Sequence, residues 1–141
     1  MSGWMETHRA VVFPWNCDHL GHLNVRYYGH FFDDAGWHLW SSIGISHATL
    51  KEAGVGTVVA NINTDFIQEA SPGELLLVES AFTRLGGKSL TMKQRMTNVE
   101  TGALLARQAV VEVFFDYETR KSTDMPADIR KKLEAVLVAE D

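Results

Sequence analysis

The sequence predicts an α+β fold in which an antiparallel sheet of about five strands wraps around one long central helix. One apolar segment of helix length, residues 25–43, follows a short strand-like run and precedes four more strand-like segments. Short turns join those four segments, and short connections produce antiparallel neighbours. One apolar helix and one antiparallel sheet bury their apolar surfaces best when the sheet packs around the helix.

Length and charge restrict the classes of protein. The chain has 141 residues and a net charge of −5, so we expect a single domain over residues 1–141 that binds neither nucleic acid nor a membrane. The first ten residues have no apolar core, and no apolar run approaches the roughly 20 residues of a membrane span. One cysteine excludes an internal disulfide and fits a reducing compartment, which predicts a cytoplasmic location.

The first strand is expected over residues 8–13, an apolar run that stops before a proline. In residues 25–43 apolar side chains recur at steps of three and four, which is the period of a helix. Asn24 is the expected N-cap of this helix, and Gly44 is its expected end.

Aromatic residues widen the apolar face of the predicted helix, so we expect it to be buried on most sides. Trp15, Trp37 and Trp40 could line an aromatic pocket or fill the core, and the core is the favoured assignment. Gly29 and Gly36 lie inside the helix, where glycine costs about 1 kcal/mol relative to alanine. Close approach of other backbone would explain both.

The remaining segments read as a short helix at 48–53, strands at 57–66, 75–85, 89–98 and 103–116, and a last amphipathic helix from Pro126. In the 57–66 strand, alternation places Val58, Ala60, Ile62 and Phe66 on one face, with Asn61, Asn63 and Asp65 on the other.

The loop WNCDHLGHLN, residues 15–24, concentrates polar chemistry directly before the long helix. Asp18 lies near a helix N-terminus, where backbone N–H groups can stabilise a developing negative charge. A carboxylate beside such a site is a minimal apparatus for acyl transfer. His22 is either a second catalytic group or a residue that holds the loop closed, and we favour shaping and polarising the site. Asn24 is a helix cap on local grounds.

Two other chemistries use the same loop. Cys17 beside a histidine is a possible thiol nucleophile, but adjacent side chains seldom point at each other. Cys17, His19 and His22 could hold zinc, but their spacing is not a standard ligand pattern and a fourth ligand is not evident. We therefore expect no metal.

The pattern Asp-x-x-Gly-His-x-Asn, followed by an aromatic helix with tyrosines near its start, resembles the acyl-CoA thioesterases of the 4-hydroxybenzoyl-CoA thioesterase family, which have the hotdog fold. The resemblance is carried by Asp18, Gly21, His22, Asn24, Tyr27 and Tyr28. The stretch DFIQEASPGELLLVES, residues 65–80, is similar to that family's second block. The similarity covers roughly residues 11–115.

The resemblance implies roles for individual residues. Asp18 would be the nucleophile or general base, with His22 as the second catalytic residue. Some members carry a histidine seven residues after the aspartate, where this chain has Val25. Substrate-binding positions implied by the resemblance are Asn24, Tyr27, Tyr28 and Asp65.

Thioester chemistry agrees with so small a set of groups. A thiol has a pKa of about 8.5, so its thiolate leaves with little help from an acid. A carboxylate, a water and an oxyanion hole suffice. The reaction can pass through a mixed anhydride on Asp18 or through a water that Asp18 activates.

Coenzyme A would enter as part of the substrate, and we expect no separate cofactor. Its phosphates need local positive charge, and Arg84, Lys88 and Ser89 surround the Gly86-Gly87 turn. A solvated hairpin explains the same residues equally well.

The leading functional hypothesis is hydrolysis of a small or medium acyl-CoA. A non-catalytic acyl-CoA-binding protein is the alternative. An acyl-thioester dehydratase or hydratase ranks lower, because those enzymes typically carry Asp-x-Asn-x-x-His and this histidine comes four residues after Asp18. A sheet wrapped on one helix leaves an open edge, so we expect a homodimer joining two sheets. Tetramers of such dimers are common among similar proteins.

Overall fold

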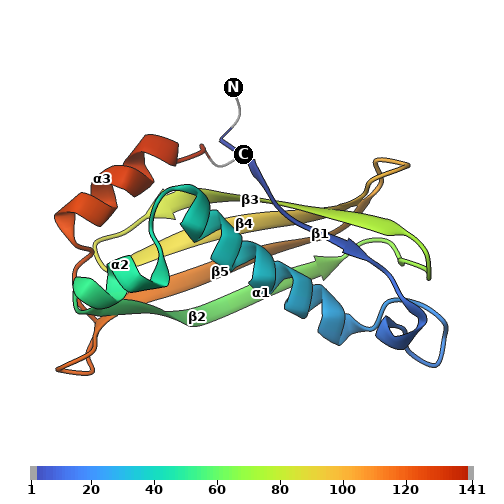
Figure 1. The fold of residues 1–141 in the computed structure, drawn as a ribbon, viewed down its shortest axis with the longest axis horizontal. Helices are drawn as coiled ribbons and strands as arrows, with labels where there is room; N and C mark the ends of the chain where they lie inside the picture. Colours follow the sequence, from blue (N-terminus) through green and yellow to red (C-terminus); the bar gives the residue numbers. More distant parts are fainter. Residues whose placement is uncertain (1–2, 140–141) are drawn as a thin grey trace.

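The computed structural model describes residues 3–139 and consists of one five-stranded antiparallel sheet with helices on its concave side (Figure 1). The strand order is β1-β3-β4-β5-β2. The strands are β1 (Met5–Val11), β2 (Val55–Phe66), β3 (Leu75–Leu85), β4 (Ser89–Asn98) and β5 (Leu104–Asp116). The predicted fold class is confirmed.

The long helix α1 spans Val25–Ser42, close to the predicted bounds. The side chain of Asn24 accepts a hydrogen bond of 3.1 Å from the N–H of Arg26, so the predicted N-cap is confirmed. Gly44, with a φ of +79°, follows the end of the helix. Two shorter helices are α2 (His47–Glu52) and α3 (Ala127–Val136), and a single 3-10 turn, η1, covers Pro14–Asn16. Within the described residues no helix is long and apolar enough to cross a membrane.

The first strand begins earlier than its apolar run. β1 starts at Met5, where it pairs with Ser80 of β3, and ends at Val11. Val12 donates instead to the carbonyl of Glu74, the residue before the start of β3. Polar residues can extend β1 because pairing with β3 satisfies their backbone N–H and C=O groups. A search for apolar residues alone does not detect such pairing.

Helix α1 makes most of its sheet contacts with β1 and β3. The concave side chains Val110 and Phe114 of β5 are nevertheless buried, whereas Val59 and Ile62 of β2 are exposed. Trp40 is buried, but Trp37 is 61% exposed and Trp15 is 69% exposed. The prediction that the helix is buried on most sides, with these tryptophans in the core, is therefore wrong for Trp37 and Trp15. The ring of Trp37 lies near His47 of α2, and that of Trp15, in η1 rather than α1, stacks on Phe13 at the surface.

A row of polar side chains crosses the concave face of the whole sheet, with one residue from each strand. Thr64 donates to Gln108 (2.7 Å), Gln108 to Gln94 (3.1 Å) and Gln94 to Ser80 (3.2 Å), and Ser80 lies 2.9 Å from Thr7. Gln94 also donates to a backbone carbonyl of α1 at 2.7 Å. The row separates two apolar clusters and ties the helix to the sheet.

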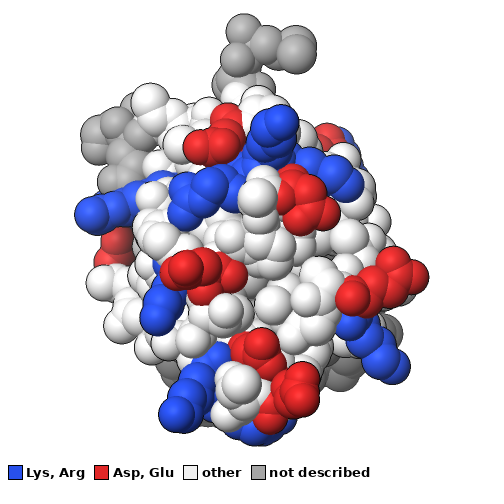
Figure 2. Space-filling model, turned by 90° about the vertical axis from the view of Figure 1, so that its left-hand side faces the viewer, with Lys and Arg blue, Asp and Glu red and all other residues white. Residues whose placement is uncertain are grey.

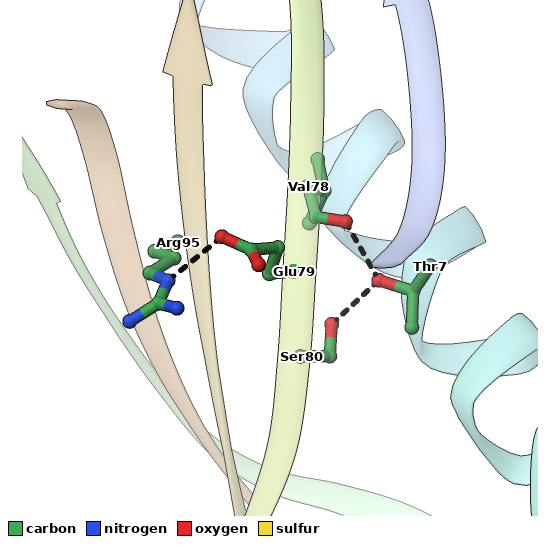
Figure 3. Close-up of polar contacts among 5 residues, drawn as sticks. All are labelled: Thr7, Val78, Glu79, Ser80 and Arg95. Atoms are coloured by element: carbon green, nitrogen blue, oxygen red, sulfur yellow. Dashed lines mark hydrogen bonds and ion pairs between the residues drawn. The ribbon is translucent and has the colours of Figure 1, made fainter. Parts of the chain in front are cut away.

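Figure 3 shows the β3 end of this row, where alternation along the strand sorts the side chains. Ser80 and Thr7 lie on the helix side, and the hydroxyl of Thr7 also donates to the carbonyl of Val78 at 3.1 Å. Glu79 points to the opposite side, where it accepts from Arg95 at 3.0 Å. At this point the concave face therefore carries hydrogen-bonded hydroxyl groups, whereas the opposite face carries an ion pair.

A β-bulge in β2 overturns one prediction about side-chain faces. The register with β5 shifts between Val59 and Asn61. Because one extra residue reverses the alternation, Val59 joins Ile62 and Phe66 on the concave side. Val58 does not share the face of Ile62, contrary to simple alternation.

Candidate active site

The loop before α1 is held in a compact turn by its own backbone. The N–H of Asp18 donates to the carbonyl of His22 (2.9 Å), and the N–H of Gly21 donates to the carbonyl of Asp18 (3.0 Å). Gly21 has a φ of +82°, a conformation that favours glycine. Oδ1 of Asp18 accepts the N–H of Leu20 at 2.9 Å. This turn presents the Asp18 carboxylate at a defined position.

Two further hydrogen bonds fix the loop to the rest of the fold. Leu23 donates to the carbonyl of Ala70 (2.8 Å), in the segment after β2. Asn24 donates to the carbonyl of Asn16 (2.8 Å), in η1. The loop therefore lies against residues 66–70, far away in the sequence, at the right-hand end of Figure 1.

A cavity of about 220 Å³ opens between the loop and that segment. It brings three predicted site residues together: Asp18, His22 and Tyr28. Its other lining residues are Leu20, Leu23, Val25, Phe66, Ile67, Gln68 and Glu69.

Glu69 is a site residue that the sequence did not single out. Its Oε2 lies 3.1 Å from Nε2 of His22, so the two form an ion pair when the histidine is protonated. Glu69 lies in the stretch that resembles the family's second block. It comes 47 positions after His22, so only the fold brings the two side chains into contact. The histidine is thereby held toward the cavity by a carboxylate.

The two predicted tyrosines lie in different surroundings. Tyr28 is buried, its ring packs edge-on against Phe66 at 5.1 Å, and burial raises the pKa of its hydroxyl. Tyr27 does not line this cavity, and its ring packs near His30 and Phe31. Asn24 uses its side chain to cap α1.

Asp65 lies away from the Asp18 cavity. It accepts a hydrogen bond of 3.1 Å from Arg107. Its neighbours Thr64 and Phe66 face the concave side, so Asp65 faces the opposite side of the sheet. Within one protomer the structure does not bring Asp65 to Asp18.

Arg84, Lys88 and Ser89 lie at the β3–β4 turn, beside α3 and at the left-hand end of Figure 1. A strand the length of β3, roughly 35 Å, separates this turn from the Asp18 end. Figure 2 views this end and shows basic and acidic side chains interspersed. In a single protomer, therefore, the predicted coenzyme-binding turn and the Asp18 loop are far apart.

A larger cavity of about 600 Å³ lies on the concave side of the sheet, beside α1. It is bounded by α1, α2, β2, β4 and β5. Val25 and Phe66 line both cavities, so the larger one begins where the Asp18 cavity ends. Gly29 and Trp37, on the open flank of α1, belong to its wall.

Comparisons with known proteins agree with this arrangement. A model of the thioesterase-like superfamily matches residues 12–133. The long-chain acyl-CoA thioesterase FadM of Escherichia coli strain K12 is 28% identical over 134 residues, which cover 94% of this chain and 99% of that protein.

Solved structures show the same fold. The probable thioesterase YbaW of Escherichia coli has a TM-score of 0.81 at 25% identity, over 94% of this chain and 99% of that one. A thioesterase superfamily protein of Jannaschia sp. CCS1 has a TM-score of 0.84 at 24% identity, over 94% and 92%. An Asp-to-Asn mutant of 4-hydroxybenzoyl-CoA thioesterase, complexed with 4-hydroxybenzoyl-CoA, has a TM-score of 0.83 at 19% identity, over 94% and 99%.

The family model extends from the residue after β1 into α3 and so includes the Asp18 loop and the whole sheet apart from β1. The predicted hotdog fold and thioester hydrolase class are thereby confirmed. The chain belongs to the thioesterase-like superfamily.

Proposed function

We propose that this protein hydrolyses the thioester of a small or medium acyl-CoA to the free acid and coenzyme A, with Asp18 as nucleophile or general base. The observation that carries the proposal is the shared cavity of Asp18, His22 and Tyr28 at the N-terminus of α1. The relative named as a long-chain acyl-CoA thioesterase supports the acyl-CoA class of substrate.

The carboxylate of Asp18 has one oxygen available. Oδ1 is occupied by the N–H of Leu20, whereas within residues 3–139 no hydrogen bond or ion pair engages Oδ2. That oxygen attacks the thioester carbon, or it takes a proton from a water that attacks. In either route the C–S bond breaks, coenzyme A leaves as the thiolate, and water supplies the second oxygen of the free acid.

The developing oxyanion is assigned to the N-terminus of α1. Asn24 engages the N–H groups of Arg26 and Tyr27. The N–H of Val25, the first residue of the helix, has no hydrogen-bond acceptor among residues 3–139, and Val25 lines the Asp18 cavity. A backbone donor at a helix N-terminus lowers the energy of a nearby oxyanion, and each such donor contributes on the order of 3 kcal/mol to the transition state.

The test is Asp18→Asn, assayed by thiol release over a panel of acyl-CoAs. We expect normal folding, loss of nearly all hydrolysis and retained binding of acyl-CoA. His19→Ala, an exposed change in the same loop, is the matched control and should keep wild-type turnover. Wild-type turnover in Asp18→Asn would refute the mechanism. Binding without turnover in the wild-type protein would instead support a non-catalytic acyl-CoA-binding role.

We also propose a homodimer in which two sheets join at β2, with pairing into a tetramer. β2 is an edge strand, and its exposed apolar residues include Val58, Val59 and Ile62. Exposed apolar edge strands tend to pair with another chain. Ile62→Lys should shift the mass measured by analytical ultracentrifugation toward the monomer, and an unchanged mass would exclude this edge. Coenzyme A as the only cofactor-like group, and a cytoplasmic location, remain predictions.

A further inference from the structure

The larger cavity follows one face of α1 along nearly the whole helix. The α1 residues that line it recur at steps of three and four, from Val25 at the start to Ser41 near the end. These two residues are 16 positions apart, which is about 24 Å along a helix. Val25 also lines the cavity of Asp18. The larger cavity therefore begins beside the candidate catalytic carboxylate and extends away from it along the helix.

The volume of the larger cavity exceeds what a short or aromatic acyl group needs. It is about 600 Å³, whereas a dry apolar cavity of about 150 Å³ already binds benzene. An acetyl or benzoyl group held at Asp18 would leave most of that volume unfilled. An extended alkyl chain advances about 1.3 Å per carbon, because its C–C bonds of about 1.5 Å are staggered. A chain of about 12 carbons therefore spans about 15 Å, which lies well within the length of the cavity.

The polar side chains on the sheet side of the cavity need no partner from a ligand. Thr64 donates to Gln108, and Gln108 donates to Gln94. Thr57 donates to Glu112 in the same way. Among the described side chains, no buried polar atom lacks a hydrogen-bond partner. A hydrocarbon chain that lies over these groups leaves no hydrogen bond unmade, so covering them carries little penalty.

Apolar side chains supply much of the remaining lining. Phe32, Trp37 and Trp40 lie on the helix side, and the sheet side includes Ile62 and Val110. Trp37 and Ile62 are largely exposed. Contact with an aliphatic chain would remove this apolar surface from water, which is the main source of affinity for such a ligand. The lining therefore fits an unsubstituted chain.

Two glycines of α1 lie in the wall of the larger cavity, although glycine disfavours a helix relative to alanine. Close approach of other backbone explains neither of them. A Cβ built on Gly29 meets no atom within 4 Å, and one built on Gly36 meets only the side chain of Met92, at 3.2 Å from Cε. Gly29 lies one turn after Val25, or about 6 Å along the helix, which about five carbons span. Its missing side chain leaves the cavity open where a longer chain passes α1.

The contact between Met92 and Gly36 limits how far a chain extends along α1. Gly36 lies about 16 Å along the helix from Val25, a distance that about 12 carbons span. A longer chain has to displace the side chain of Met92, which lies against the helix at Gly36.

We propose that an unbranched aliphatic acyl chain of about 12 carbons extends from Asp18 past Gly29 to Met92, with Gly29 as a specificity-determining residue. The substrate class is then a medium-chain, unsubstituted acyl thioester, and acetyl and benzoyl thioesters are poor substrates. This inference rests on the proposed hydrolysis at Asp18, since the chain enters the larger cavity in this way only if its thioester lies there.

The first measurement is kcat/KM of the wild-type protein for acetyl-CoA, benzoyl-CoA, dodecanoyl-CoA and hexadecanoyl-CoA, by thiol release below the micelle concentration. We expect dodecanoyl-CoA to exceed acetyl-CoA and benzoyl-CoA by at least about 100-fold, since each buried methylene can contribute up to about fourfold. Hexadecanoyl-CoA should gain less than about tenfold over dodecanoyl-CoA. Equal values for dodecanoyl-CoA and either smaller thioester would overturn the inference, and so would a larger gain with hexadecanoyl-CoA.

Variants of Gly29 test its role. Gly29→Val should lower kcat/KM for dodecanoyl-CoA at least about tenfold more than for acetyl-CoA, and Gly29→Ala should have a smaller effect of the same kind. His30→Val is the matched control, because it places the same side chain at the next position of α1, where the exposed His30 lines neither cavity. This control should keep the wild-type ratio of the two substrates. Melting curves establish that each variant is folded, and an unchanged ratio in Gly29→Val would overturn the role of Gly29.

Binding without turnover separates this inference from the proposed hydrolysis. S-ethyl-CoA and S-dodecyl-CoA are thioethers that cannot be hydrolysed, and calorimetry measures their affinity for the wild type and for Gly29→Val. The dodecyl thioether should bind the wild type more tightly than the ethyl thioether, and the difference should shrink in Gly29→Val. That result in a protein that hydrolyses no thioester would refute the proposed function and leave this inference standing. Equal affinities of the wild type for the two thioethers would overturn the inference, whether or not the protein is a thioesterase.

Discussion

Nε2 of His22 lies 3.1 Å from Oε2 of Glu69, and this contact joins the Asp18 loop to the segment that follows β2. The side chain of His22 is 35% exposed and that of Glu69 is 73% exposed. So exposed a pair adds little to stability. The contact instead orients His22, because it holds the imidazole along the wall of the Asp18 cavity.

His22→Ala should lower kcat less than Asp18→Asn, because His22 positions and polarises the site rather than transferring the proton. Glu69→Gln should give a smaller loss, and that loss should disappear in the His22→Ala background if Glu69 acts through His22. The measurement is a double-mutant cycle on kcat. A loss in His22→Ala as large as in Asp18→Asn, with one limb of the pH profile removed near the histidine pKa, would make His22 the general base.

Replacing Arg84 and Lys88 together by alanine should raise KM for acyl-CoA with little change in kcat. Phosphate contacts act equally in the ground and transition states, so their loss removes uniform binding. The effect should shrink at high salt, where the Debye length falls below about 8 Å. Thioesters of a pantetheine analogue without the nucleotide are the control and should not distinguish wild type from variant. Unchanged kinetics with full acyl-CoA would show that the turn does not bind the nucleotide and is only a solvated hairpin.

The distance between this turn and Asp18 within a protomer adds a second test. If the turn binds the nucleotide, it does so for a site whose Asp18 belongs to another protomer. Mixed oligomers of Asp18→Asn chains and Arg84→Ala/Lys88→Ala chains should then recover a low-KM component, measured by kinetics on the co-expressed complex. Simple averaging of the two parents would contradict binding across protomers.

Glu112→Gln should stabilise the protein increasingly as pH rises from the ordinary carboxyl pKa of 4.5. Burial raises the folded pKa of Glu112, the charge of Asp33 adds to the shift, and hydrogen bonds from Thr57 and Trp40 oppose it. Below 4.5 the group is protonated in both states. Above it the unfolded chain loses the proton first, so the wild type loses stability until pH passes the folded pKa. The difference in Tm between variant and wild type should grow over this window; a constant difference would contradict it.

Gly29→Ala should raise the Tm by roughly 3 to 5 °C, because alanine favours the helix by about 1 kcal/mol and the added methyl meets open space. Gly36→Ala is the matched change in the same helix. Its new Cβ would lie 3.2 Å from Cε of Met92, so the methionine must shift and the gain should be smaller. Calorimetric melting of both variants tests this. Equal increases in Tm would show that the side chain of Met92 moves aside without loss of stability.

Local patterns in the sequence determined the elements and the reactive loop. The strands Leu75–Leu85 and Ser89–Asn98 begin and end as predicted, because alternation and turn residues are properties of neighbouring positions. The cap at Asn24 is equally local. The motif around Asp18 identified the family, since four residues within seven consecutive positions, followed by Tyr27 and Tyr28, match its pattern.

Only the tertiary structure decided which distant groups meet. Glu69 reaches His22 because the segment after β2 lies against the loop. Glu112 is buried in the wall of a cavity because α1 and α2 come to lie opposite β2, β4 and β5. The bulge after Val59 changes which residues of β2 face that cavity. None of these follows from spacing along the chain, because each depends on register and on the placement of a helix over a sheet, which arise from the summed packing of many residues.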